Sequence, residues 1–347
     1  METLPRKVSI IGCGKVGMRF AYSMVIKGLA RELCLVDYYK EVAEGEAMDL
    51  ADGGPFLSPV DIYSGDYCDT ANSELVIITA GAGRKPGQSR IDLVKGNVEI
   101  IKSIIPHVVK YSPGAIILVV SNPVDILSYV TYKISGKPSN EIIGSGTLLD
   151  TARLVNLLKG LFDVNIRSIH APIFGEHGET AFPAWSKATI GGVPLEDAFE
   201  AFDKEVDYKQ ELARIFQQVK DRGREVIKRK GETSYGIGLS MTRISKAVLK
   251  NEKSVLPVST LLQDYHGVSG VYLSVPAIVG KTGIEKVLKV RFNDEEMAAF
   301  RHSAQEVKKV IFRSLLARPV RPGLTFCRLL LGLFDCNPNL FFCEDEF

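Results

Sequence analysis

Residues 7–37 of this chain are KVSIIGCGKVGMRFAYSMVIKGLARELCLVD. An apolar run at residues 8–11 is followed by the glycines Gly12, Gly14 and Gly17, and then by a stretch with helical spacing. This order predicts a strand, a tight turn and a helix. In such a turn the first glycine permits the bend, the second lets backbone approach a pyrophosphate, and the third lets the helix pack on the strand. The N-terminus of the helix then offers its unpaired N–H groups to the phosphates.

A second apolar run, residues 33–36, ends at Asp37. A carboxylate at this place accepts hydrogen bonds from the hydroxyls of an adenine ribose and repels a 2′-phosphate. The strand, the glycine turn, the helix and the acidic residue stand in the order of a dinucleotide-binding fingerprint. We therefore expect a dinucleotide site with NAD, rather than NADP, as the cofactor.

The composition of the 347 residues is that of a globular protein, with 46% hydrophobic and 24% charged residues, and the length accommodates two domains. A net charge of +2, with no basic block interleaved with aromatic residues, argues against a nucleic-acid partner. No run reaches the ~18 apolar residues of a membrane span. The N-terminal segment lacks an apolar signal core. The six cysteines are scattered without C-x-x-C spacing, so we expect reduced thiols, a cytoplasmic protein and no metal site.

Strand-like apolar runs alternate with helical patterns through the first part of the chain. Strands are expected at residues 8–12, 32–37, 74–80, 115–121 and 141–144, and helices at residues 15–28, 41–51 and 91–110. Near-continuous apolar strands separated by helices predict an α/β fold with a doubly wound parallel Rossmann sheet.

Beyond about residue 150 the pattern becomes mixed. A strand is expected at residues 168–175, helices at 209–230 and 234–249, a paired strand at 271–280 and a last helix at 293–316. We expect an NAD-binding domain over residues 1–147 and a second, α+β substrate and catalytic domain over residues 148–317.

Residues 318–347 differ in kind from the rest of the chain. Pro319, Pro322 and Gly323 interrupt the helical pattern, and an apolar stretch follows at residues 324–334. This stretch is too short to span a bilayer and too apolar for a solvated surface. Two interpretations stay open. We favour an extension without a role in the chemistry over a segment that docks on a partner or on the chain itself.

His177 lies in the segment GEHG, directly after the strand expected at residues 168–175. A lone histidine is more often structural, but reduction of a carbonyl by a nicotinamide needs a proton donor that titrates near neutral pH. Asp150 is the candidate carboxylate that fixes the imidazole. Arg153 lies one helical turn after Asp150, and a guanidinium binds a carboxylate through two hydrogen bonds. Alone, this Asp-x-x-Arg pair would be a surface ion pair; with His177 it predicts a site for a small 2-oxo acid.

Residues 80–92, AGAGRKPGQSRID, form a glycine-rich cationic segment after a predicted strand. Its glycines are typical of a hinged lid. Arg84 and Arg90 would then lie over a bound anion and exclude water. The alternative is a solvated loop with incidental charge.

With SNPVD at residues 121–125 and GSGT at residues 144–147, these motifs make the chain similar to the L-lactate/malate dehydrogenase family. The resemblance runs in order from about residue 6 to residue 316. It implies that His177 donates and accepts the proton, with Asp150 as its partner. It also implies that Arg153 binds the substrate carboxylate and that Arg90 polarises the carbonyl.

Further contacts follow from the same resemblance. Asn122 would contact the substrate and the nicotinamide ribose, Thr233 would line the pocket, and Ile237 would lie against the nicotinamide. The residues that it places at the cofactor are Gly12, Gly14, Lys15, Val16, Gly17, Asp37, Ala80, Gly81, Ser121, Asn122 and Ile237. The resemblance also implies a homotetramer or a dimer.

Arg84 bears on the choice of substrate. At this loop position the resemblance implies glutamine for lactate enzymes and arginine for malate enzymes, because a second guanidinium suits the extra carboxylate of oxaloacetate. The motifs at residues 123–127, 145–147 and 256–260, together with Thr233, are similar to the lactate branch. We expect pyruvate and L-lactate as substrates, with oxaloacetate and L-malate as the alternative and Arg84 as the substrate-binding residue in question.

Two sets of residues bear on allosteric regulation and on whether the chain is catalytically active. His170 fits the histidine of the fructose 1,6-bisphosphate site of allosteric bacterial lactate enzymes, but Val155 stands at the position of the arginine. We expect weak or absent activation. The alternative of a non-catalytic nucleotide-binding protein predicts the loss of at least one residue of the catalytic set, and all four are present: His177, Asp150, Arg153 and Arg90.

Overall fold

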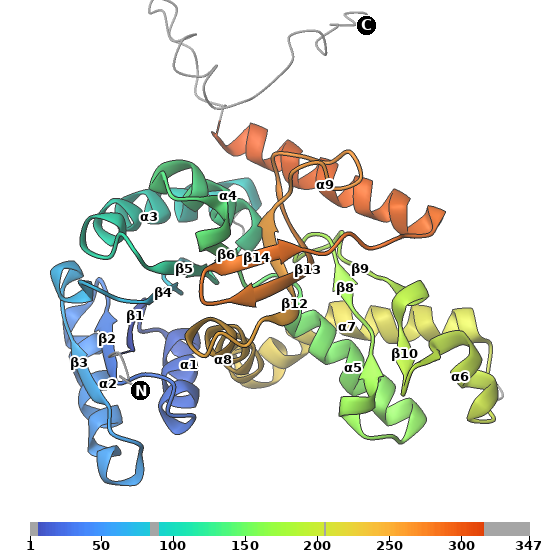
Figure 1. The fold of residues 1–347 in the computed structure, drawn as a ribbon, viewed down its shortest axis with the longest axis horizontal. Helices are drawn as coiled ribbons and strands as arrows, with labels where there is room; N and C mark the ends of the chain where they lie inside the picture. The colour runs from blue at the N-terminus through green and yellow to red at the C-terminus, as the bar shows by residue number, and fades with distance from the viewer. Residues whose placement is uncertain (1–5, 84–89, 205, 316–347) are drawn as a thin grey trace, which may run out of the picture.

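The computed structural model describes residues 6–83, 90–204 and 206–315 (Figure 1). Within these ranges a nine-stranded sheet runs in the order β14-β13-β12-β6-β5-β4-β1-β2-β3. The strands from β3 to β6 are parallel, as the alternating pattern predicts. They are β1 (Lys7–Ile11), β2 (Glu32–Val36), β3 (Asp61–Ser64), β4 (Leu75–Ile78), β5 (Ile116–Val119) and β6 (Ile142–Gly144).

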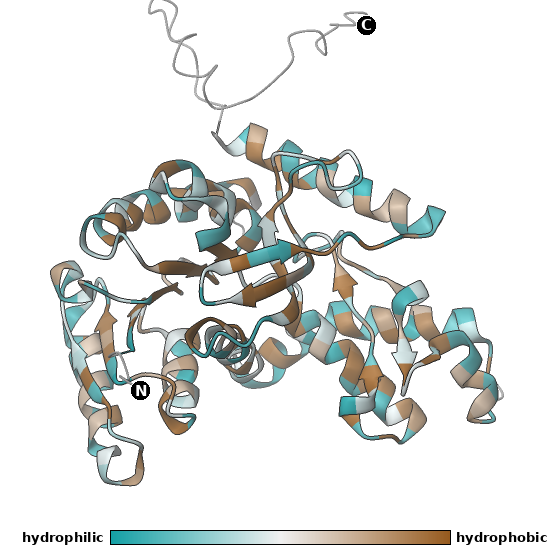
Figure 2. Ribbon diagram, in the orientation of Figure 1, coloured by the Kyte–Doolittle hydropathy of each residue, from teal (hydrophilic) through white to brown (hydrophobic). Residues whose placement is uncertain are grey.

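Helices cover both faces of this sheet. Because successive strand residues point to opposite faces, Ile10 and Ile11 belong to two different buried clusters. Figure 2 shows apolar residues gathered in the strands, with hydrophilic residues on the outer faces of the helices. The helices that contribute to the two clusters are α1 (Lys15–Ile26), α2 (Lys40–Asp52), α3 (Arg90–Tyr111), α4 (Val124–Ser135), α8 (Tyr235–Leu249) and α9 (Asp294–Leu315).

The second part of the chain adds its own core, in which Leu158 and Ile215 are buried together. Its helices are α5 (Leu148–Phe162), α6 (Leu195–Ala201) and α7 (Tyr208–Lys230). Its short strands are β7 (Ile169–His170), β8 (Ile173–Phe174), β9 (Phe182–Pro183), β10 (Thr189–Ile190) and β11 (Val193–Pro194).

The prediction of a single strand over residues 168–175 is wrong. The structure divides it into β7, which pairs with β10, and β8, which pairs with β9. Ala171 and Pro172 lie between the two, and a proline has no N–H group for a strand ladder. The break turns the chain from one small sheet to another and brings Phe174 to the loop that carries His177.

Three antiparallel strands extend the Rossmann sheet beyond β6: β12 (Ser254–Leu261), β13 (Tyr272–Gly280) and β14 (Gly283–Val287). The sequence predicted strand structure at residues 271–280 but not its place in this sheet. The boundary at residue 147 therefore stays a prediction, because one sheet contains strands from both sides of it. Residues 318–347 and Arg84 lie outside the described residues.

The C-terminal ends of the parallel strands meet at one edge of the sheet. The turn at Gly12 follows β1, and the Ala80 N–H donates a hydrogen bond to the carbonyl oxygen of Ile11 (2.9 Å). Ser121 and Ser145 follow β5 and β6 at the same edge, where the Ser145 N–H bonds to the carbonyl oxygen of Val119 (2.9 Å). Ligands of open α/β sheets bind outside this edge.

Candidate active site

The glycine turn has the geometry that its fingerprint requires. Gly12 has φ +109°, and a Cβ placed on it would lie 2.4 Å from the backbone nitrogen of Ala80. A Cβ on Gly17 would lie 2.1 Å from the carbonyl oxygen of Gly12, so only glycine lets α1 begin this close to β1. A Cβ on Gly14 would have no heavy atom within 4 Å. The turn is therefore closed against the protein at its first and third glycines and open at the second, which fits a pyrophosphate at the start of α1.

Asp37 holds the turn from the end of β2. Its Oδ2 accepts a hydrogen bond from the Cys13 N–H (2.6 Å), and its Oδ1 accepts one from the Tyr39 N–H (2.9 Å). A carboxylate has about four acceptor sites, so each oxygen keeps capacity for a ribose hydroxyl. The predicted cofactor residue thus also fixes the backbone of the turn, a role that the sequence pattern did not reveal.

The residues after β4 and β5 form the floor beside this turn. The Ser121 hydroxyl donates to the carbonyl oxygen of Ala80 (2.6 Å), and Gly81 follows directly. Asn97 of α3, which the sequence analysis missed, joins the two loops. Its amide nitrogen donates to the carbonyl oxygen of Asn122 (2.7 Å), and its amide oxygen accepts from the Ala82 N–H (2.8 Å). Asn97 is only 2% exposed, and a buried amide needs hydrogen-bond partners, but this burial is visible only in the folded structure.

The structure brings His177 and Asp150 together. His177 Nδ1 lies 2.6 Å from Asp150 Oδ2, and Arg153 donates to Asp150 Oδ1 (3.1 Å). Asp150 is in the first turn of α5, and His177 is in the loop after β8. Both contacts occupy one carboxylate, as the expected roles require.

The two ionisable partners shift each other's pKa. Burial alone would raise the pKa of Asp150, but the charge of His177 and its hydrogen bond, with those of Arg153, lower it below its ordinary value. Burial alone would lower the pKa of His177, but the charge and the hydrogen bond of Asp150 raise it above its ordinary value. The pair is therefore held as a carboxylate beside a readily protonated imidazole.

A cavity of about 380 Å³ lies beside Arg153 and is also lined by Thr233, Arg222 and Lys230. Arg153 and Thr233, the predicted substrate residues, thus share one cavity. Gly223 of α7 faces the Arg153 guanidinium, because a Cβ on it would lie 3.8 Å from one of the terminal nitrogens of Arg153. The space next to the guanidinium suits a small carboxylate ligand.

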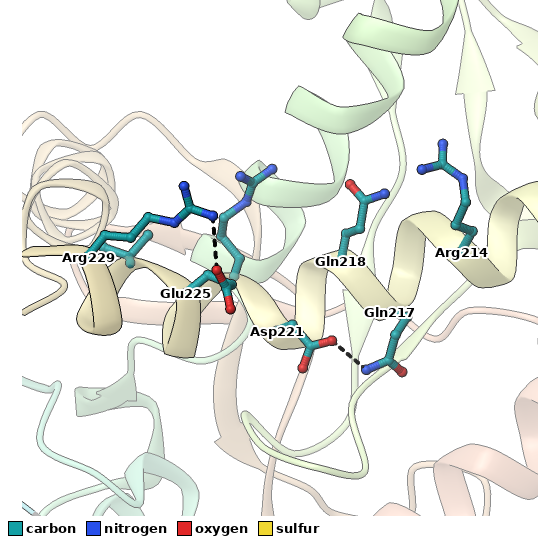
Figure 3. A pocket seen from close by; sticks show the side chains of 8 residues that line it. Arg214, Gln217, Gln218, Asp221, Glu225 and Arg229 are labelled. Carbon is teal, nitrogen blue, oxygen red and sulfur yellow. Dashed lines mark hydrogen bonds and ion pairs between the residues drawn. The ribbon is translucent and has the colours of Figure 1, made fainter.

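A larger hollow of about 550 Å³ follows α7 (Figure 3). Its labelled side chains all come from α7, where Gln217 points to Asp221 and Arg229 to Glu225. Arg222 lines both cavities. Because long, solvated side chains paired on one helix form this hollow, we assign it no part in the chemistry.

The remaining predicted site residues fall at the edges of this region. Lys15 and Val16 begin α1, and Ile237 in α8 is partly buried against the same apolar cluster as Val16. Arg90 is the first residue of α3, while Arg84 lies outside the described residues. Their roles stay predictions.

The expected absence of a fructose 1,6-bisphosphate response also stays a prediction. His170 in β7 is exposed, and Val155 packs against the apolar core of the second part of the chain. Across the described part of the chain, no three His, Cys, Asp or Glu side chains gather in a way that could hold a metal ion. No helix within residues 6–83, 90–204 and 206–315 is long and apolar enough to cross a membrane.

Comparison with known proteins assigns the chain to a family. The model of the lactate/malate dehydrogenase NAD binding domain matches residues 6–144, and that of the lactate/malate dehydrogenase alpha/beta C-terminal domain matches residues 147–315. The chain belongs to the lactate/malate dehydrogenase family. The predicted fold class, NAD as the cofactor and an oxidoreductase acting on a CH–OH donor are confirmed by this membership.

Relatives within this family are similar over nearly their whole length. An L-lactate dehydrogenase of Acetivibrio thermocellus is 49% identical over 308 residues, which are 88% of this chain and 96% of the relative. One of Priestia megaterium is 46% identical over 313 residues, 90% of this chain and 97% of the relative. The crystal structure of a lactate dehydrogenase from a Medee basin deep-sea metagenome library has a TM-score of 0.86 at 40% identity, covering 89% of this chain and 99% of that one. The minor L-lactate dehydrogenase of Enterococcus mundtii has a TM-score of 0.85 at 41% identity, covering 90% and 98%.

Proposed function

We propose that this chain catalyses the reversible, NAD-dependent interconversion of pyruvate and L-lactate. The observation that carries the proposal is that Asp150 contacts both the proton-donor candidate His177 and the carboxylate-binding candidate Arg153. One carboxylate thereby sets the distance between the group that handles the proton and the group that anchors the substrate. The names of the relatives in Acetivibrio thermocellus and Priestia megaterium support pyruvate and L-lactate as the pair.

The proton passes through the second ring nitrogen of His177. Because Asp150 is held ionised, His177 donates from Nδ1, and Nε2 carries the proton that is transferred to the carbonyl oxygen. The chemistry that NADH supplies when bound is donation of a hydride to the carbonyl carbon. Asp150 stabilises the imidazolium before transfer, and its charge holds the ring in the required tautomer.

Arg153 anchors the substrate carboxylate while Arg90 polarises its carbonyl. The Arg153 guanidinium uses one terminal nitrogen for Asp150, so its other donors stay available for a bidentate contact in the cavity that Thr233 shares. Arg90 belongs to the segment predicted to be a lid, residues 80–92, and is also the first residue of α3.

Oxaloacetate is the competing substrate, because Arg84 occupies the discriminating position of the loop. The test compares kcat/KM for pyruvate and oxaloacetate in the unmodified chain and in Arg84→Gln. Arg301→Gln, an exposed arginine on α9, serves as the matched control. We expect pyruvate to be preferred by the unmodified chain. A large preference for oxaloacetate that disappears in Arg84→Gln, but not in the control, would overturn the proposal in favour of malate chemistry.

We further propose that the chain assembles as a homodimer or homotetramer in the cytoplasm. Tyr22 and Ile26 of α1 and Tyr235 and Leu239 of α8 are each more than half exposed, and the Arg19 guanidinium of α1 lies 5.1 Å from the Tyr235 ring. Apolar surface of this kind is typical of a subunit contact.

Light scattering tests this assembly. Leu239→Glu should reduce the mass in solution, whereas a glutamate at Phe312, an exposed apolar side chain of α9, should not. A monomer in the unmodified chain contradicts the proposal. The cytoplasmic location is supported by Cys13 and Cys34, which are buried free cysteines, and cell fractionation tests it.

A further inference from the structure

Asp125 is a buried carboxylate that the proposed proton transfer does not use. It lies in the first turn of α4 and is 2% exposed. Its Oδ2 accepts a hydrogen bond from the backbone N–H of His177 (2.8 Å), and its Oδ1 accepts one from the Ser259 hydroxyl of β12 (2.5 Å). A charged group so far from water is unfavourable unless other groups compensate it. Its position against the catalytic histidine therefore calls for a physical explanation.

His177 is held at both ends by carboxylates from different helices. Asp150 of α5 binds the imidazole at Nδ1, and Asp125 of α4 binds the main chain of the same residue. The Gly175 N–H and C=O pair with Ser274 of β13 in an isolated bridge just before it. The backbone and the ring of His177 are thus fixed independently, which is what alignment of Nε2 with a substrate requires.

The charges around His177 come from three directions. Asp150 and Arg153 face it from α5, and Asp125 faces it from α4. Glu176, its neighbour in the loop, faces Asp125. The strand β12 and the helix α9 contribute the hydroxyl groups of Ser259 and Ser303, which bond to Asp125 and to the Glu176 N–H respectively.

We propose that Asp125 is a positioning residue for His177, acting through the hydrogen bond to its main chain and through the negative charge that favours its imidazolium. This inference rests on the proposed function only for its kinetic test. The charge of Asp125 adds to that of Asp150 in raising the pKa of His177. Burial raises the pKa of Asp125 itself to about 7, and the charge of Glu176 adds to this, while the hydrogen bonds from Ser259 and His177 oppose it.

The test is Asp125→Asn, with Glu296→Gln as the matched control. Glu296 is also a buried carboxylate, at 6% exposure, and it also accepts hydrogen bonds from a serine hydroxyl and from backbone N–H groups: the hydroxyl and the N–H of Ser186 and the N–H of Asn293. Glu296 lies in the first turn of α9 and is not part of the candidate active site. Both variants lose a buried charge, but only Asp125→Asn removes one that faces His177.

The expected result is a change in chemistry, not only in stability. In Asp125→Asn, kcat/KM for pyruvate should fall about tenfold because the histidine loses alignment. The alkaline limb of its pH profile should move to lower pH by about one unit, since a negative charge that favours the imidazolium is lost. NADH affinity should stay unchanged. Glu296→Gln should lower the unfolding midpoint and leave the limb where it is.

Two further measurements keep the outcome decisive. Ser259→Ala removes a hydrogen bond that keeps Asp125 ionised, so the limb should move in the same direction by a smaller amount, even if Asp125→Asn does not fold. NMR titration of the His177 imidazole in the chain without substrate reports the same shift when there is no turnover. If the unmodified chain does not reduce pyruvate, the proposed function fails while this titration still tests Asp125. An unmoved His177 titration in both variants overturns the positioning role and leaves Asp125 a structural group.

Discussion

Gly14 and Gly17 belong to the same turn, but replacing each by alanine should have a different effect. Gly14→Ala should weaken cofactor binding, whereas Gly17→Ala should destabilise the fold. A Cβ on Gly17 would lie 2.1 Å from the carbonyl oxygen of Gly12 and 2.9 Å from Oγ1 of Thr79. A Cβ on Gly14 would meet no heavy atom within 4 Å. The same substitution therefore overlaps the protein at Gly17. At Gly14 it enters open space where the fingerprint predicts the pyrophosphate.

The size of each stability change depends on whether the atoms that the new methyl group meets can move away. Carbon and oxygen at 2.1 Å must separate by more than ~1 Å to reach ordinary contact, and the Gly12 oxygen is a backbone atom that cannot rotate away. We expect Gly17→Ala to destabilise the fold by about 3 kcal/mol, the upper part of the usual range for overpacking. The unfolding midpoint should fall by roughly 4 °C. Gly14 has φ −74° and ψ 179°, which alanine adopts freely, so its substitution should change stability by less than about 1 kcal/mol.

The assay pairs thermal unfolding with a fluorescence titration of NADH. Gly14→Ala should keep the midpoint and weaken NADH binding about tenfold or more, equivalent to at least ~1.4 kcal/mol. Gly160→Ala in α5 is the control, because its Cβ also meets no heavy atom within 4 Å and it lies outside the glycine turn. NADH binding by Gly14→Ala as tight as in the unmodified chain would refute the placement of the cofactor. An unchanged midpoint in Gly17→Ala would refute the packing argument.

Three further predictions concern the acid–base pair. His177→Asn should abolish pyruvate reduction and leave NADH affinity nearly intact, since the proton donor is lost while the dinucleotide turn is untouched; ordinary turnover in this variant contradicts the mechanism. Asp150→Asn should move the alkaline limb of pyruvate reduction to lower pH, because the raised pKa of His177 depends on Asp150. The pair should also stabilise the fold. The raised His177 pKa contributes stability that is complete below its unfolded value of 6.5 and is lost as the pH rises through the folded value. The lowered Asp150 pKa contributes stability that is present above 3.8 and is lost as the pH falls through the folded value. The difference in unfolding free energy between the unmodified chain and Asp150→Asn should therefore be largest between these two values, and a difference independent of pH contradicts the linkage.

The parts of the site that the sequence predicted are those fixed by local chemistry. The glycine turn follows from neighbouring residues, since positive φ and close packing at Gly12 and Gly17 are properties of a few adjacent positions. The pairing of Asp150 with Arg153 follows from helical spacing. The contact between Asp150 and His177 was expected from chemical need and from resemblance, and the structure places the two side chains at 2.6 Å.

The missed features depend on which distant segments become neighbours. Asn97 is informative only after the loops following β4 and β5 are known to lie on either side of its amide. The strands β12 to β14 carry no local signal for joining β6. Their apolar pattern would be the same whether they extended the Rossmann sheet or formed a separate antiparallel sheet in the second domain. Asp125 was visible within a motif, yet its burial against the His177 main chain appears only when α4, β12 and the loop after β8 are assembled.

The two halves of the site are built by different physical means, and this difference predicts how each will respond to substitution. The cofactor half depends on close approach of the backbone at the glycine turn. It should therefore be sensitive to the volume of any side chain introduced at Gly12, Gly14 or Gly17. The acid–base half depends on buried charges, so its sensitivity lies in protonation, and changes there should appear in pH profiles. Asp37 belongs to the first half although it is charged, because its oxygens accept hydrogen bonds from backbone N–H groups, that of Cys13 in the glycine turn and that of Tyr39 after β2. Asp125 belongs to the second half although it binds a backbone N–H, because the residue that it holds, His177, is the proposed proton donor.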